Sequence, residues 1–311
     1  MRPLYAISLK LISVALFVTM AALIKIGTQE VPIGQAVFAR SFFAVPIIIG
    51  FLWHQGHLHD GFKTKQPLGH LWRGVLGTSA MATGFGSLAL LPLPEASAIG
   101  YAAPLLTVIF AAVFLGERLR AFRLGAVGLG LAGVLVVSVP NFTISSVSAS
   151  LGVGAALGLV SATLRAGAVV TVRALVRSET TSTIVFYFSI ISSLIGILTF
   201  PVGLFYDEFA WVIPTPTAGL ALLLAGLFGG VGQLMVTTSY RFAEIGVLAP
   251  FDYTSMIFAV GLGLWIWGDW PSIYTIIGTP IVVTAGLLII YRERQLGLAR
   301  SKAKQTAVDY K

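Results

Sequence analysis

The chain has no cysteine among its 311 residues, and only 10% of its residues are charged. Without cysteine, a disulfide scaffold, thioether-attached haem and thiolate metal sites are all excluded. With 57% hydrophobic residues and a mean hydropathy of +0.92, the chain is far more apolar than a soluble domain. Several apolar runs reach the ~20 residues that a helix needs to cross a bilayer. The sequence therefore predicts an all-α integral membrane protein.

The net charge of +8 is a second compositional feature. A basic surplus can indicate nucleic-acid binding, but membrane proteins acquire one through their cytoplasmic loops. We therefore expect membrane lipids as partners and no nucleic acid. The chain also lacks a GxxxxGK[ST] phosphate-binding loop, so direct coupling to ATP is not expected and no cofactor is predicted.

The apolar runs divide into ten predicted transmembrane helices. The N-terminal run resembles a signal peptide, but Lys10 interrupts it and it is long, so we interpret it as the first helix. The ten ranges are 4–26, 32–53, 69–91, 95–115, 121–139, 151–173, 183–205, 217–240, 245–266 and 272–291.

The basic residues predict the orientation of these helices. With the N-terminus inside, 16 of the 20 lysines and arginines fall on the cytoplasmic side, as the positive-inside rule requires. Lys63, Lys65 and Arg73 are counted among the cytoplasmic residues. Both termini are thus predicted to be cytoplasmic.

The two halves of the chain resemble each other. A shift of 149 pairs Glu95 with Glu244, and a shift of 152 pairs Tyr101 with Tyr253 and Glu117 with Asp269. Because each unit holds an odd number of helices, the second unit enters the membrane upside down. We predict domains at 1–140 and 141–291, followed by a polar cytoplasmic tail at 292–311. Two inverted five-helix repeats around a central cavity would allow alternating access, so transport is the leading interpretation.

Three motifs carry a resemblance to a known family. They are Arg40 within PIGQAVFARSFF, the PxxxVIFAxxFLGERL pattern that ends the helix 95–115, and the glycine-rich helix 121–139. Together they resemble the drug/metabolite transporter superfamily, in its EamA-type branch. The resemblance implies a secondary transporter in the bacterial cytoplasmic (inner) membrane. Its cargo would be a small metabolite such as an amino acid, an aromatic compound or a flavin. In the second half, GDW replaces the GER-like ending.

Polar residues inside the predicted helices are the candidate substrate-binding residues, because polar groups in hydrocarbon turn toward cavities or partners. Arg40 lies ~11 Å from the outer surface, and Arg165, Gln233 and Asp252 lie ~10 to 12 Å from the inner one, at 1.5 Å per residue. We hypothesise that Arg165 and Asp252 face each other or share a substrate carboxylate, with Gln233 adding hydrogen bonds. The alternative is a structural ion pair. Asp252 is also the candidate site for protons as coupling ion.

Tyr101 and Tyr253 occupy equivalent positions in the two halves and are candidates for stacking on an aromatic cargo. Packing or interfacial tyrosines are the alternative.

Lys25 and two prolines are candidates for gating. Lys25, at the outer end of the first helix, either gates the outer mouth or extends to the interface, as Lys10 is expected to do at the inner end. Pro104 and Pro250 should kink helices 95–115 and 245–266 and act as hinges.

The histidine-rich loop offers an alternative function. His54, His57 and His59 could serve an integral membrane enzyme or a lipid-handling protein, although such a loop is more often solvated and no metal is predicted. We predict a transporter, not an enzyme, acting as a monomer or homodimer.

Overall fold

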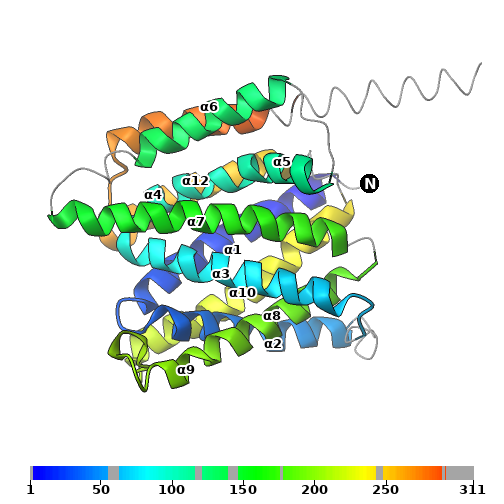
Figure 1. Cartoon of the computed structure of the whole chain (residues 1–311), viewed down its shortest axis with the longest axis vertical. Coiled ribbons are helices and arrows are strands. Elements are labelled where there is room, and N and C mark those ends of the chain that lie inside the picture. Colours follow the sequence, from blue (N-terminus) through cyan, green and yellow to red (C-terminus); the bar gives the residue numbers. More distant parts are fainter. Residues whose placement is uncertain are drawn as a thin grey trace, which may run out of the picture.

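The computed structural model describes residues 3–54, 63–115, 121–138, 146–175, 178–242, 248–288 and 291, and within these ranges it has helices and no strand (Figure 1). The all-α prediction is therefore confirmed for the described chain. The tail 292–311, Glu117 and Glu244 lie outside these ranges. The elements are α1 (Pro3–Gly27), α2 (Ile33–His54), α3 (Pro67–Leu90), α4 (Leu93–Gly100), α5 (Ala102–Leu115), α6 (Ala121–Ser138), α7 (Ser146–Leu175), α8 (Thr181–Ile197), α9 (Thr199–Val202), η2 (Asp207–Phe209), α10 (Pro216–Phe242), η3 (Ala249–Thr254), α12 (Ser255–Trp267) and a further helix at Ile273–Leu288.

Five of these helices are long and apolar enough to cross a bilayer: Leu4–Gly27, Ile33–His54, Ser150–Val172, Ser182–Val202 and Pro216–Val236. Many of their large apolar side chains are exposed, which suits a surface in contact with lipid rather than water. The chain is therefore a multi-pass membrane protein.

Two helices depart from regular α-geometry beside a proline. The segment predicted as one helix at 95–115 is instead α4 and α5, separated at Tyr101. Pro104 has no N–H to donate to the carbonyl of Gly100, so the hydrogen-bond ladder is interrupted there. Pro250 stands at the start of the 3₁₀ helix η3, which leads into α12. That these positions act as hinges stays a prediction.

The packing of the helices has an exchange symmetry. The most extensive contacts are those of α1 with α10, α3 with α7, and α2 with α8. Exchanging α1 with α7, α2 with α8 and α3 with α10 converts the first pair into the second and leaves the third unchanged. The contacts of α2 with α10 and of α3 with α8 are related in the same way. In Figure 1 these helices lie side by side along roughly one direction.

The contacts around Leu91 relate the direction of α1 to that of α7. The ammonium of Lys25, near the C-terminal end of α1, donates a hydrogen bond to the carbonyl of Leu91. Gly154, near the N-terminal end of α7, lies against Leu90 and Leu91. The end of α1 and the beginning of α7 therefore lie at the same end of the bundle, so the two helices run in opposite directions.

At the other end of the bundle, the Glu179 carboxylate connects two segments that join helices. Glu179 accepts hydrogen bonds from the Thr64 hydroxyl at 2.9 Å and from the backbone N–H groups of Lys65 at 2.7 Å and Gln66 at 3.1 Å. Burial acts to raise the pKa of Glu179, but these hydrogen bonds lower it below its ordinary value. The basic link before α3 is thus attached to the link between α7 and α8.

Glycines allow the closest helix contacts, as at Gly196 of α8. A Cβ at this position would lie 2.8 Å from both the backbone N and the Cα of Phe38 in α2. Since backbone cannot rotate away as a side chain can, only glycine fits without moving one helix.

We expect Gly196→Ala to destabilise the protein by roughly 1–3 kcal/mol, the usual cost of overpacking. Gly261→Ala in α12 is the matched control, because nothing lies within 4 Å of its Cβ position. Thermal unfolding in detergent should show a lower Tm for the first variant and an unchanged or higher Tm for the second. Equal behaviour of the two variants would contradict the close α2–α8 contact.

Candidate functional site

Arg165 of α7 is an accessible cation within the bundle. Its guanidinium lies beside two glycines, because a Cβ at Gly84 of α3 would be 3.8 Å from one Nη and a Cβ at Gly100 of α4 would be 3.9 Å from the other. The side chain is nevertheless exposed. Next to it, Ser161 donates a 2.6 Å hydrogen bond to the Ala80 carbonyl of α3. Three helices, α3, α4 and α7, thus flank an exposed guanidinium that can donate hydrogen bonds to a carboxylate or another acceptor.

The two predicted tyrosines meet. The rings of Tyr101 and Tyr253 are 5.2 Å apart between centroids and tilted by 64°, an edge-to-face arrangement. The Tyr101 hydroxyl donates to the Tyr253 carbonyl at 3.2 Å and accepts from the Ser255 hydroxyl at 2.7 Å. Tyr101 is only 7% exposed, so in this conformation the pair joins the α4–α5 break to the start of α12. Binding of cargo by the tyrosines stays a prediction.

Asp252 forms an ion pair with Lys10, not with Arg165 as hypothesised from the sequence. Its carboxylate lies 2.6 Å from the Lys10 ammonium, and its side chain is 49% exposed. Lys10 is 2% exposed, so the expectation that it extends to the membrane interface was wrong. A lysine on the inner face of α1 lowers its electrostatic energy by pairing with a carboxylate instead of reaching water. Asp252 therefore links η3 to α1 by an ion pair.

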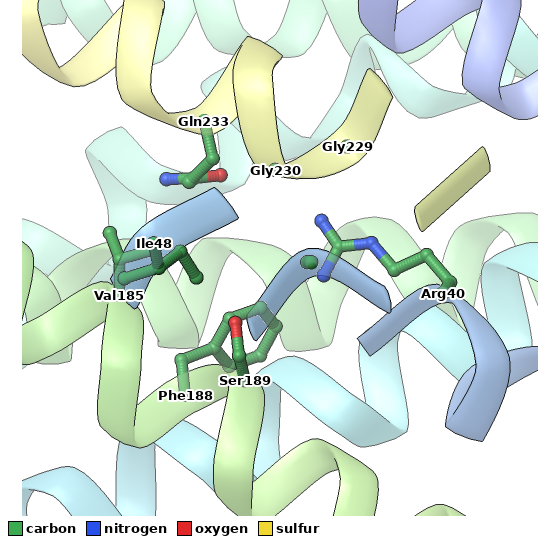
Figure 2. Close-up of a pocket in the computed structure, with 9 residues that line it drawn as sticks. Arg40, Ile48, Val185, Phe188, Ser189, Gly229, Gly230 and Gln233 are labelled. Atoms are coloured by element: carbon green, nitrogen blue, oxygen red, sulfur yellow. The ribbon is translucent and has the colours of Figure 1, made fainter. Parts of the chain in front are cut away.

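Arg40 and Gln233 line one narrow pocket. Figure 2 shows the Arg40 guanidinium, from α2, and the Gln233 amide, from α10, directed into a space beside Phe188 and Ser189 of α8. The guanidinium packs against Gly229, where a Cβ would lie 3.2 Å from its Nε. Arg40 is only 6% exposed. The structure thus brings together two of the predicted residues, Arg40 and Gln233. Arg165 does not line this pocket.

A third arginine, Arg73, also lies in this region, although it was not predicted from the sequence to be a site residue. It was counted as a basic residue of the cytoplasmic side, but it lies within α3, with its guanidinium 4.0 Å from the Phe188 ring centroid. The Arg40 guanidinium lies 5.8 Å from the same centroid. Gly77, one turn after Arg73, gives the guanidinium room, because a side chain there would occupy the same space. The run GHLWRGVLG offered a signal: an arginine between glycines at helical spacing.

Lys25 stands among charged and aromatic groups at the opposite end of the bundle from Glu179. Its ammonium lies 5.3 Å from the Trp267 ring centroid and has Glu95 and Asp269 as charged neighbours. Glu95 is 8% exposed and receives hydrogen bonds from Ser272. The ends of α1, α4 and α12 are thus held together by polar contacts.

The histidine loop offers no site in the described chain. His54 ends α2, whereas His57 and His59 lie outside the described residues. Among the residues that are described, no three His, Asp or Glu side chains are grouped to hold a metal ion.

Apolar helices with exchange-symmetric packing define a multi-pass membrane protein, and this one holds cations among its helices. The chain belongs to the EamA-like transporter family, whose model matches residues 4–139 and 152–292. The family resemblance read from the sequence is therefore confirmed, and the family identifies a transporter, not an enzyme.

Similar proteins carry transporter names. The chain is 31% identical to the pseudopaline exporter CntI of Pseudomonas aeruginosa, over 86% of this chain and 90% of that protein. It is 27% identical to a riboflavin transporter of Rhizobium johnstonii, covering 84% and 82%. It is 23% identical to an S-adenosylmethionine uptake transporter of Rickettsia bellii, covering 84% of each. A crystal structure with a TM-score of 0.66 and 20% identity, covering 94% of this chain and 98% of that one, shares the fold.

A double-mutant cycle can test which cation is coupled to Asp252. We expect Lys10→Met and Asp252→Asn to be non-additive, with a coupling free energy of roughly 1–3 kcal/mol. Arg165→Met combined with Asp252→Asn should be additive, because the structure gives Asp252 its 2.6 Å contact with Lys10. Thermal or denaturant unfolding in detergent provides the free energies. Coupling in the second cycle and none in the first would contradict this assignment.

Proposed function

We propose that the protein is a secondary transporter that moves a small organic metabolite across the bacterial cytoplasmic membrane by alternating access. The observation that carries this proposal is the exchange symmetry of the helix contacts, together with the opposite directions of α1 and α7. Two similar halves with opposite polarity can exchange conformations, and that exchange opens a central site first to one side and then to the other.

The proposed topology has ten crossings in two inverted five-helix repeats, with domains at 1–140 and 141–291. α4 and α5 together form one interrupted crossing, and Ile273–Leu288 forms the last. Both termini are proposed to be cytoplasmic, with the tail 292–311 on that side. The attachment of the basic link at Lys63 and Lys65 to Glu179 supports this orientation, because basic links gather on the cytoplasmic side.

The proposed cargo is an amino acid or an aromatic or heterocyclic compound. Three observations support a small organic molecule: relatives named for riboflavin, S-adenosylmethionine and pseudopaline, the exposed Arg165 between Gly84 and Gly100, and the Tyr101–Tyr253 pair. Arg165 would bind a carboxylate of the cargo, and the partly exposed Tyr253 would contact its ring.

The moving parts are proposed from the breaks in the helices and from the contacts at the outer end. Pro104 and Pro250 would bend as hinges, since the α-helical ladder is already interrupted beside each of them. Lys25 would gate the outer mouth through its contacts with Leu91 and Trp267. Protonation of Asp252 would weaken its ion pair with Lys10 and so couple transport to the proton gradient.

Uptake into proteoliposomes tests the proposal. Labelled amino acids, flavins, nucleosides and S-adenosylmethionine should be assayed with and without a pH gradient. We expect accumulation of at least one of these classes and its loss in Arg165→Ala, because the cation that orients the cargo is removed. Asp252→Asn should retain exchange but lose its response to the pH gradient.

The matched control is Thr163→Ala on the same helix. Thr163 is exposed, and its hydroxyl bonds the Leu159 carbonyl of its own helix at 2.9 Å, so its loss should leave transport unchanged. Arg165→Ala that transports like the wild type, at equal folded yield, would remove Arg165 from the site. Absence of transport for every class would count against the proposed cargo.

A further inference from the structure

A buried arginine, Arg40, and a partly buried one, Arg73, share the Phe188 ring. The Nε of Arg40 has no hydrogen-bond partner, nor do the Nε and Nη1 of Arg73. Both guanidinium groups lie over Phe188, at 5.8 and 4.0 Å from the ring centroid. They are close enough for the charge of Arg40 to act on Arg73. Two like charges therefore lie together in the interior with unused donors.

No carboxylate of the described chain neutralises this pair. Every acidic residue of the described ranges lies elsewhere. Glu30 accepts a hydrogen bond from the Thr215 hydroxyl, and Asp207 and Glu208 lie on the exposed helix η2. The other four carboxylates are those beside Lys10 and Lys25 and the one that binds the link before α3. They are Glu30, Glu95, Glu179, Asp207, Glu208, Asp252 and Asp269. Phe188 attracts both cations through its ring face, but such attraction offsets only part of the cost of removing two ions from water. An anion between the guanidinium groups would offset the remaining cost of desolvation.

We infer that Arg40 and Arg73 bind an oxyanion, the carboxylate or phosphate group of a small molecule, beside Phe188. The guanidinium fork matches such groups with paired N–H donors. Further polar groups stand nearby, because Ser189 of α8 and Gln233 of α10 line the adjoining pocket together with Arg40 (Figure 2). This site differs from the one at Arg165, which is exposed and lies against α4 and a later part of α3, at Gly100 and Gly84.

The inference deepens the proposed function and rests on it where the oxyanion belongs to the cargo. Because the arginines come from α2 and α3 and the ring from α8, an anion there contacts both halves of the chain. Its entry and release would require these helices to separate, which alternating access provides.

Thermal unfolding of the purified protein in detergent tests the site. The probes are sodium glutarate and sodium phosphate, with uncharged glutaramide and sodium chloride of equal ionic strength as controls. We expect Tm to rise progressively with glutarate or phosphate and to stay unchanged with glutaramide and with chloride. An equal rise with chloride indicates general screening and overturns the inference, as does the absence of any rise.

Variants locate the anion. The Tm rise should be lost in Arg40→Met and Arg73→Met, reduced in Arg73→Lys, which keeps the charge but not the fork, and retained in Arg165→Met. Without anion, Arg73→Met should unfold at the same or a higher Tm than the wild type, because an unneutralised buried charge has been removed. If Arg73→Met does not fold, the reduced rise in Arg73→Lys carries the test. A rise lost in Arg165→Met but kept in Arg73→Met and Arg73→Lys would place the anion elsewhere and overturn the inference.

Transport assays distinguish whether the bound oxyanion belongs to the cargo or is free phosphate. If the oxyanion belongs to the cargo, labelled glutarate enters proteoliposomes and Arg73→Met abolishes its uptake. If it is free phosphate, phosphate raises Tm and the uptake of another cargo depends on its presence. The anion site is overturned if anions do not change Tm and if wild type and Arg73→Met take up neutral compounds equally. That result would leave the proposed transporter function intact. An intact Tm rise without any transport counts against the transporter alone.

Discussion

Hydrocarbon surrounds most of this chain, and every charge placed among its helices therefore needs a partner or a polar space. Lys10 and Asp252 satisfy this requirement with each other across α1 and η3. Lys25 satisfies it with a backbone carbonyl, an aromatic ring and nearby carboxylates. The arginines differ, because no carboxylate of the described chain neutralises Arg40, Arg73 or Arg165. The described helices thus enclose cations that no carboxylate neutralises, as the proposed binding of an anion requires.

The symmetry of the fold explains how such a guest could be reached from both sides. α3 contacts α7 as α1 contacts α10, and the helices of each pair come from different halves. Close packing at glycines such as Gly158 of α7, whose Cβ position lies 3.0 Å from the Ser87 hydroxyl of α3, makes these interfaces firm. Motion is therefore expected at the breaks near Tyr101 and η3 rather than within the helices. A rigid pair of helices that tilts about such breaks opens one end as it closes the other.

Much of the helical architecture could be predicted from the sequence, because a helix that crosses hydrocarbon must be long and apolar. Boundaries moved by a few residues, as where α3 begins at Pro67 instead of 69. The equivalence of Tyr101 and Tyr253 was also visible in the repeat, whereas the direct contact between their rings was not predicted. The family could be identified because the sequence contains the motif PxxxVIFAxxFLGERL, which resembles the corresponding helix end in the EamA-type family.

Side-chain partners could not be predicted in the same way, because depth along a helix does not give direction around it. Arg165 and Asp252 were predicted to lie at a similar depth, yet Asp252 pairs with Lys10 on a third helix. Arg73 was assigned to the cytoplasmic side by its position near a helix start, whereas its side chain lies over Phe188. Only the packing of α2, α3 and α8 brings Arg40 and Arg73 to one ring.

Alternating access requires that the interior beside Arg165 open in turn to the two sides of the membrane. Because the chain has no cysteine, Gly100→Cys supplies a single thiol there, at a position whose Cβ has its nearest neighbour 3.9 Å away. In oriented proteoliposomes, a membrane-impermeant thiol reagent should modify this residue when added from either side. Modification from neither side, or from one side only under all conditions, would contradict alternating access.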